Sequence, residues 1–245
     1  MWYTICVKIL YIRRSPTKYK AIFFENDGTH TYYVQEKVNW SNKIIEEWSG
    51  KSFELPYDKM IMLFNKAKEN RTYKYKNLED EKEFFQRYFK YLLIEEGVIE
   101  KVEERAKLLF DELWCNGDRA LYPDTIEVLE YFKNKGFKIE VISDTSPLLQ
   151  YSLKQLGIDK YFDSFIASSL VGAGKPSPII FNIALDSVGV KAEESLYVDD
   201  YKPEADGARL QGFISFLIDR SIKEKKEWET NSLKEIINFV EKLDE

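Results

Sequence analysis

The sequence of 245 residues has little sulfur or imidazole with which to stabilise a fold or build a site. It contains two cysteines, Cys6 and Cys115, and a single histidine, His30. Two cysteines make no disulfide framework, and their spacing is not that of a metal site. We therefore expect a reduced, cytoplasmic setting and a site built from other side chains.

A basic surplus and a long apolar run are also missing. The net charge is −6 at pH 7, whereas nucleic-acid binding domains that rely on phosphate contacts usually carry excess positive charge. The apolar stretch at residues 1–12 is too short to span a membrane and is interrupted by Lys8. No small-x-small cleavage site follows, so we expect a strand or a loosely attached leader there rather than a signal peptide. Neither a nucleic acid nor a membrane is therefore the expected partner, and no signal indicates an oligomeric state.

The spacing of apolar residues along the sequence changes twice, from that of a strand to that of helices and back. Residues 18–24 form an apolar run typical of a buried parallel strand, which stops abruptly at acidic residues and glycine. From about 38 to 115 the apolar residues recur at helical spacing in four stretches, which predicts an all-helical insert of about 80 residues. After Pro123, strand and helix patterns alternate.

This alternation predicts an α/β fold with a doubly wound parallel sheet and helices on both faces. The strands predicted after the insert are residues 137–142, 164–167, 195–198 and 213–218. The helices predicted between and after them are residues 125–134, 147–156, 178–188, 203–211 and 233–243. The domain organisation that follows is an N-terminal extension at 1–17, a sheet domain at 18–34 and 116–245, and a helical domain at 35–115.

Polar side chains follow three of the predicted strands at the point where each strand ends. They are Glu25 with Asp27, Ser143 with Asp144, and Asp199 with Asp200. Any one pair by itself is better explained as turn or helix-cap residues. Because ligands of such sheets bind beyond the carboxyl ends of the strands, the three pairs together favour a site, which the loop carrying Lys175 can join.

Several carboxylates at one rim repel each other unless a cation lies between them. Mg²⁺ suits hard oxygen ligands and typically shares its shell among one or two carboxylates, water and substrate phosphate. Lys175 and the Ser143 hydroxyl would then contact phosphate oxygens, and the backbone around Gly28 and Thr29 would add N–H donors. The rim is therefore expected to hold a phosphate group beside Mg²⁺.

At these positions the chain resembles the haloacid dehalogenase (HAD) superfamily, in particular its phosphatase-like members with a helical cap inserted after the first strand. Four segments carry the resemblance in order: 24–29 (FENDGT), 141–144 (VISD), 174–176 (GKP) and 197–200 (YVDD). The resemblance covers about residues 18–240. It implies a Rossmann-like core with a helical cap and a Mg²⁺-dependent phosphatase acting on a small phosphorylated metabolite.

The resemblance also implies a role for each matched residue. Glu25 stands at the position of the nucleophile that forms an acyl-phosphate, and Asp27 at that of the general acid/base. Ser143 matches the residue that hydrogen-bonds the transferring phosphoryl group. Lys175 matches the cation that neutralises the nucleophile and the phosphate.

The metal ligands that the resemblance implies come from two of the segments. Glu25 and the backbone carbonyl of Asp27 face the metal from the first segment. Asp199 matches the ligand in the last segment, and Asp200 either assists it or stands behind it.

The main departure from the family pattern is Glu25, because the family nucleophile is Asp. The extra methylene moves the carboxylate by up to about 1.5 Å, and a misplacement of about 1 Å can cost on the order of 10²-fold in rate. Two functions therefore remain open. One is a working phosphatase, and the other is a catalytically impaired protein that binds a phosphorylated ligand or partner without turnover.

The sequence also gives expectations for His30 and Glu204, and for dehalogenase and phosphonate hydrolase activity. His30, where the family usually has an apolar residue, is expected to be tolerated and partly exposed rather than to titrate at the hinge of the cap. Glu204 is expected only behind the residues that contact the metal. Asp27 disfavours a dehalogenase, which lacks an acid there. A phosphonate hydrolase, which needs a Schiff-base lysine from the cap, stays open because the helical segment is rich in lysine.

Overall fold

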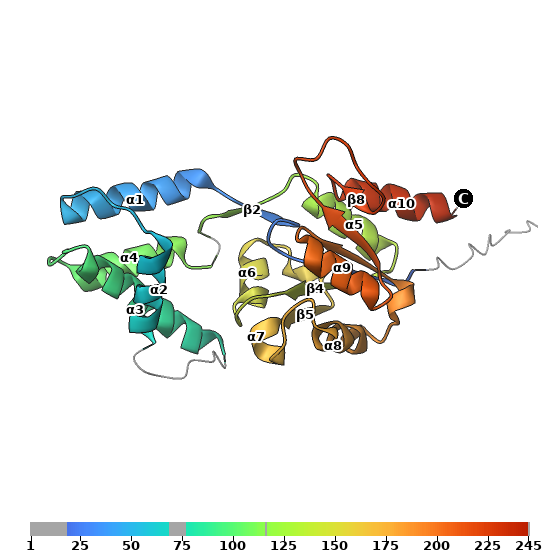
Figure 1. Cartoon of the computed structure of the whole chain (residues 1–245), viewed down its shortest axis with the longest axis horizontal. Coiled ribbons are helices and arrows are strands. Elements are labelled where there is room, and N and C mark those ends of the chain that lie inside the picture. The colour runs from blue at the N-terminus through green and yellow to red at the C-terminus, as the bar shows by residue number, and fades with distance from the viewer. Residues whose placement is uncertain (1–18, 69–76, 116, 245) are drawn as a thin grey trace, which may run out of the picture.

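The computed structural model of the chain describes residues 19–68, 77–115 and 117–244. Figure 1 shows a sheet with its helices at one end of the molecule and a second group of helices at the other, with β2 (Thr31–Tyr33) between them. The predicted N-terminal extension and Cys6 lie outside the described residues.

The main sheet has six strands in the order β5-β4-β1-β6-β7-β8, and every neighbouring pair is parallel. The strands are β1 (Ala21–Phe24), β4 (Lys138–Ser143), β5 (Ser164–Ala167), β6 (Ser195–Asp199), β7 (Ile214–Ile218) and β8 (Glu229–Thr230). The predicted parallel sheet is confirmed. Since Phe24 pairs with both Val141 and Val198, the residues that follow β1, β4 and β6 meet at one edge.

Both faces of the sheet are covered, as the central strand shows. All four residues of β1 are fully buried, with Ile22 and Phe24 in one hydrophobic cluster and Ala21 and Phe23 in another. This alternation follows from the two-residue period of a strand. The helices α5 (Thr125–Asn134), α6 (Leu149–Gln155) and α10 (Lys234–Asp244) contribute to the first cluster, and α8 (Pro178–Val188) and α9 (Lys202–Leu210) to the second.

Four helices form the second part of the molecule, which we call the helical unit. They are α1 (Gln35–Ser49), α2 (Tyr57–Ala67), α3 (Leu78–Glu95) and α4 (Val102–Leu113). Their apolar faces share a hydrophobic cluster of their own. The unit also contacts the sheet domain, because the buried carboxylate of Glu81 on α3 accepts hydrogen bonds from Ser146 Oγ at 2.6 Å and Leu148 N at 3.1 Å.

A two-stranded antiparallel ribbon lies where the chain leaves the sheet domain and where it returns. β2 pairs with β3 (Arg119–Leu121), so that Tyr33 lies opposite Arg119 and Thr31 opposite Leu121. Neither this ribbon nor the short helix α7 (Ser168–Val171), which follows β5, was predicted from the sequence. Among the described helices, none has the length and apolar character needed to cross a bilayer.

Candidate active site

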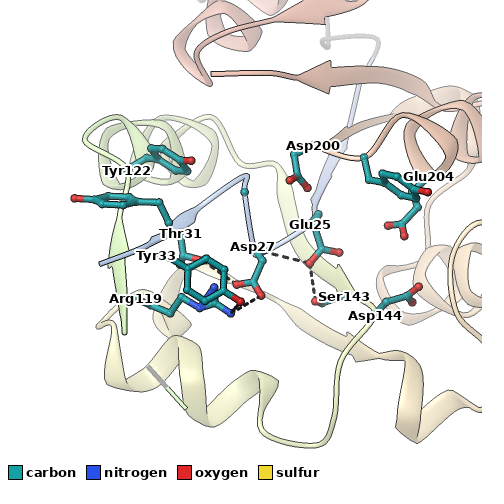
Figure 2. A pocket seen from close by; sticks show the side chains of 13 residues that line it. Glu25, Asp27, Thr31, Tyr33, Arg119, Tyr122, Ser143, Asp144, Asp200 and Glu204 are labelled. Carbon is teal, nitrogen blue, oxygen red and sulfur yellow. Dashed lines mark hydrogen bonds and ion pairs between the residues drawn. The ribbon is translucent and has the colours of Figure 1, made fainter. Parts of the chain in front are cut away.

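A cavity of about 420 Å³ opens at the carboxyl edge of the sheet, beside the ribbon (Figure 2). Its wall includes most of the residues that the sequence singled out, namely Glu25, Asp27, Gly28, Ser143, Asp144, Asp200 and Glu204. The parallel register of β1, β4 and β6 brings these strand ends together. Lys175 and Asp199 are buried and do not line the cavity, although both belong to the same network of contacts.

Glu25 is held by both of its carboxylate oxygens. Oε1 accepts a hydrogen bond of 2.6 Å from Ser143 Oγ and a longer one of 3.4 Å from the backbone N–H of Asp27. Oε2 forms an ion pair with Lys175 Nζ. Burial raises the pKa of Glu25 above its ordinary value, and the positive charge of Lys175 acts in the opposite direction.

Lys175 is the centre of a buried charge network. Its Nζ contacts Glu25, lies 2.8 Å from Oδ2 of Asp199 and lies 2.5 Å from Oε2 of Glu204, and its side chain is 0% exposed. Burial by itself lowers the pKa of a lysine, but the negative groups around Lys175 raise it well above its ordinary value. The ammonium group therefore keeps its charge and compensates three carboxylates.

Glu204 has a larger part in this network than the sequence indicated. It forms a direct ion pair with Lys175 and lines the cavity. Burial raises the pKa of Glu204 to about 7. One oxygen each of Glu25, Asp199 and Glu204 lie within 4.8 Å of one another. Because Lys175 Nζ already contacts all three residues, this group is a compensated ion cluster.

The two adjacent aspartates after β6 have different surroundings. Asp199 is fully buried: its Oδ2 accepts hydrogen bonds from Lys175 Nζ and from Tyr197 OH at 2.6 Å, and its Oδ1 accepts one from the backbone N–H of Tyr201 at 2.8 Å. Asp200 instead reaches the cavity wall. Burial and the nearby charge of Asp199 raise the pKa of Asp200.

The Asp200 carboxylate lies directly against Gly28. A Cβ atom on Gly28 would come within 1.9 Å of Asp200 Oδ2, and the backbone of Gly28 has a φ of +74°. Only glycine meets both conditions without strain. The N–H of Gly28 donates to the Thr31 carbonyl at 2.9 Å, and Thr29 is fully buried and does not line the cavity.

Asp27 points toward the ribbon (Figure 2). Its Oδ1 accepts a hydrogen bond from Thr31 Oγ1 at 2.9 Å, and its Oδ2 accepts one from Arg119 Nη2 at 3.1 Å. The same Nη2 donates to Tyr33 OH at 2.8 Å. Sequence reasoning missed Arg119 and Tyr33, because they come together only through the pairing of β2 with β3, and no motif marks either of them.

The loop that delivers Lys175 is fixed at two points. The carboxylate of Asp144 accepts from the backbone N–H of Lys175 at 2.9 and 3.1 Å. On the other side, Pro176 packs against Gly207 of α9, where an added Cβ would lie 2.3 Å from the Pro176 Cβ. The position of Lys175 thus depends on a carboxylate that follows β4 and on a glycine in α9.

His30 corrects an expectation. The sequence suggested a tolerated, partly exposed residue, but the side chain is 0% exposed. Its ring centroid lies 4.6 Å from that of Phe24 and 5.7 Å from that of Phe162. Neither ring nitrogen has a hydrogen-bond partner among the described residues. Burial, followed by the charge of Arg220, lowers the pKa of His30 to about 3, so the ring is neutral.

Comparison with known proteins settles the family. The model of the family described as haloacid dehalogenase-like hydrolase matches residues 19–212, which is most of the chain. The chain belongs to the haloacid dehalogenase-like hydrolases. This confirms the resemblance seen in the four segments and makes the protein a HAD-like hydrolase.

Among curated relatives, the glyceraldehyde 3-phosphate phosphatase of Methanocaldococcus jannaschii is 35% identical over 130 residues, which are 50% of this chain and 57% of the relative. The HAD-like hydrolase chain spans about half the length of the curated relatives it matches.

Solved structures agree on the fold. A HAD phosphatase from Thermococcus onnurineus matches with a TM-score of 0.59 at 22% identity, over 90% of this chain and 97% of that one. A 2-haloacid dehalogenase from Pseudomonas syringae pv. Tomato DC3000 matches with a TM-score of 0.63 at 18% identity, over 91% and 99%. A phosphatase and a dehalogenase therefore share this architecture, so the fold by itself does not decide the chemistry.

Proposed function

We propose that this HAD-like hydrolase is a Mg²⁺-dependent phosphomonoesterase that acts on a small phosphorylated metabolite, with the helical unit as its cap. The observation that carries the proposal is the pair of contacts on Glu25. Ser143 and Lys175, the two groups suited to phosphate oxygens, both contact the carboxylate at the nucleophile position. An acid, Asp27, lines the same cavity, and this supports phosphate chemistry over dehalogenation.

The donor set of the cavity fits Mg²⁺. Five carboxylates line it against one cationic side chain, counted over the described residues: Glu25, Asp27, Asp144, Asp200 and Glu204 against Arg119. Hard oxygen ligands in excess of positive charge are what Mg²⁺ requires. We assign Glu25, Asp200 and the backbone carbonyl of Asp27 as its ligands. Once bound, the ion would neutralise negative charge on the phosphate.

Asp199 takes a supporting part in this proposal rather than that of a metal ligand. It is fully buried beside Lys175 and, unlike Glu25 and Asp200, does not line the cavity. It thereby holds the Lys175 ammonium in place against Glu25. The metal side of the cavity is left to Asp200, whose carboxylate reaches the wall.

The proposed reaction has two steps. A carboxylate oxygen of Glu25 attacks phosphorus, the bond from phosphorus to the ester oxygen breaks, and Asp27 gives that oxygen a proton. Asp27 then takes a proton from water as the water oxygen attacks phosphorus. The bond between phosphorus and the Glu25 oxygen breaks, which releases inorganic phosphate and restores the carboxylate. Ser143 binds a phosphoryl oxygen in both steps, while Lys175, buried behind Glu25, compensates the negative charge of that carboxylate.

A second function is favoured by the way Glu25 is held. With the longer side chain, both carboxylate oxygens are engaged by Ser143 and Lys175. A carboxylate fixed in this way suits the binding of a phosphorylated ligand without turnover, because in-line attack requires one oxygen to face phosphorus at near-contact distance.

Phosphate release from a panel of phosphomonoesters, with and without Mg²⁺, tests the proposal. We expect Mg²⁺-dependent release by the wild type and by a control, Asp186→Asn, which alters an exposed aspartate on α8. Asp27→Asn should abolish release. If no ester is hydrolysed while phosphate still binds, the phosphatase proposal fails and the binding function takes its place.

A further inference from the structure

Arg119 is a half-buried cation that lines two cavities. It lines the cavity that holds Glu25, and it also lines a second cavity of about 670 Å³ between the ribbon and the helical unit. Residues of α1 and α4, Trp40 and Leu108, line that second cavity. If the phosphate of a ligand lies at Glu25, the rest of the ligand can therefore lie beside Arg119.

The guanidinium of Arg119 has a fixed orientation. Its side chain is only 14% exposed, and its guanidinium carbon lies 3.6 Å from the ring centroid of Tyr33. Nη2 donates hydrogen bonds to Tyr33 OH and to Oδ2 of Asp27. Stacking on an aromatic ring and two hydrogen bonds leave a planar group that is already positioned to receive a carboxylate oxygen.

The charge of Arg119 is distinctive within the first cavity. Among the described residues that line it, Arg119 is the sole cation. Figure 2 shows Arg119 and Tyr33 on one side of Asp27, and Glu25 and Ser143 on the other. The phosphate position and the guanidinium therefore lie on opposite sides of Asp27.

We propose that Arg119 and Tyr33 bind a carboxylate on the leaving group of the substrate, and that this site selects phosphate esters of hydroxy acids. The inference rests on the proposed function in one respect: the phosphate of the ligand lies at Glu25 and Ser143. A carboxylate is favoured because a carboxylate, that of Asp27, occupies the site in this structure.

The proposal also assigns a positioning role. When the carboxylate of the ligand takes the place of Asp27 at Arg119 Nη2, Asp27 loses that contact and its Oδ2 turns toward the ester oxygen. An ester with a neutral leaving group has nothing to exchange with Asp27 and leaves it paired with Arg119. Arg119 thus sets specificity by contacting the ligand directly. It also positions Asp27, which is released from Arg119 when the carboxylate of the ligand binds.

Two non-hydrolysable probes test the inference without requiring turnover. 3-Phosphonopropionate carries a carboxylate, and propylphosphonate has a methyl group in its place. Calorimetric titration of the full-length protein in buffer containing Mg²⁺ gives the ratio of their dissociation constants. We expect the wild type to bind 3-phosphonopropionate about tenfold more tightly or better, since hydrogen bonds to charged groups are worth at least this factor.

Arg119→Met should reduce that ratio to about one, and Tyr33→Phe should reduce it in part. Arg105→Met, which removes an arginine of α4 that lines neither cavity, is the matched control and should retain the wild-type ratio. If Arg119 serves only to tie the ribbon to Asp27, Arg119→Met lowers the unfolding temperature and leaves the ratio intact, which overturns the inference.

Absence of a preference in the wild type, including failure to bind either probe, also overturns it. Phosphate release measured on the same samples keeps the two proposals apart. A wild type that prefers 3-phosphonopropionate and hydrolyses no ester contradicts the phosphatase and retains the carboxylate site. A wild type that hydrolyses esters but binds the two probes equally well supports the phosphatase and contradicts the carboxylate site.

Discussion

The hydroxyl oxygen of Ser143 lies 2.6 Å from Oε1 of Glu25, so the last residue of β4 donates a hydrogen bond to the first residue after β1. The parallel pairing of Phe24 with Val141 fixes this contact. Lys175 engages the other oxygen of the same carboxylate. The geometry of Glu25 is therefore set by both partners, and it is the feature on which activity depends most.

Shortening Glu25 should increase turnover. In Glu25→Asp the carboxylate withdraws by about one C–C bond length, roughly 1.5 Å, to the reach that the family nucleophile has, and the gain in kcat should be on the order of 10²-fold. Glu241→Asp, the same change on the exposed side of α10, should leave kcat unchanged. A Glu25→Asp variant slower than the wild type would show that this site uses the longer side chain.

Removing the charge of Lys175 should destabilise the protein as well as inactivate it. Lys175→Met leaves Glu25, Asp199 and Glu204 without their common cation, and breaking a buried pair of this kind costs about 3–5 kcal/mol. Urea denaturation should show a loss of this size at pH 7 and a smaller one at pH 5, where protonation relieves the repulsion.

The control for this variant is Lys202→Met, which alters an exposed lysine paired with Asp206 and should cost less than about 1 kcal/mol. A Lys175→Met protein as stable as the wild type at pH 7 would mean that the three carboxylates share protons rather than a cation.

Stability should fall as the pH rises because of Glu140. This residue of β4 is 0% exposed and accepts a hydrogen bond of 2.9 Å from Ser187 Oγ. Burial raises its pKa from 4.5 to about 8. Above pH 4.5 the unfolded state loses this proton, whereas the folded state keeps it until about pH 8. The free energy of unfolding therefore decreases between pH 4.5 and 8, by roughly 5 kcal/mol at most.

Glu140→Gln removes this dependence. The variant should be more stable than the wild type at pH 9, and at pH 5 the two should differ little, as measured by urea denaturation at both values. Glu241→Gln on α10 supplies the surface control. Equal slopes of stability against pH for Glu140→Gln and the wild type would refute a protonated Glu140.

His30 should make the protein less stable as the pH falls, the opposite of the effect of Glu140. Its pKa is about 3 in the folded protein against 6.5 ordinarily, so the unfolded state binds a proton first and stability falls as the pH drops from 6.5 toward 3. His30→Leu should lose less stability between pH 7 and pH 4 than the wild type does. A loss equal to that of the wild type would indicate that the ring is already protonated when buried.

The sheet and most of the site were accessible from the sequence because they depend on local patterns. An apolar run that stops at polar residues identifies both a buried strand and its carboxyl end, and parallel pairing then brings those ends together. Glu25, Ser143 and Lys175 meet in this way. Their contacts follow from the order of strands and require no detail of the loops.

The remaining features depend on contacts between distant segments or on short-range geometry. Strands of three residues, as in β2 and β3, have no detectable period, so Arg119 could not be placed beside Asp27. Asp199 is buried and Asp200 reaches the cavity because of the two-residue period of β6. Tyr197 and Asp199 share one face of the strand, where the tyrosine hydroxyl and Lys175 donate hydrogen bonds to Oδ2 of Asp199. The burial of His30 results from the turn at Gly28, which folds the chain back toward Phe24.

Trapping a phosphoryl group on Glu25 tests the central claim most directly. In Asp27→Asn the second step lacks its base, whereas p-nitrophenyl phosphate has a leaving group that needs no proton for the first step. After incubation with Mg²⁺ and an acid quench, mass spectrometry should find the peptide containing Glu25 heavier by one phosphoryl group. Hydrolysis by the wild type with no such adduct in Asp27→Asn would contradict the assignment of Glu25 as the nucleophile.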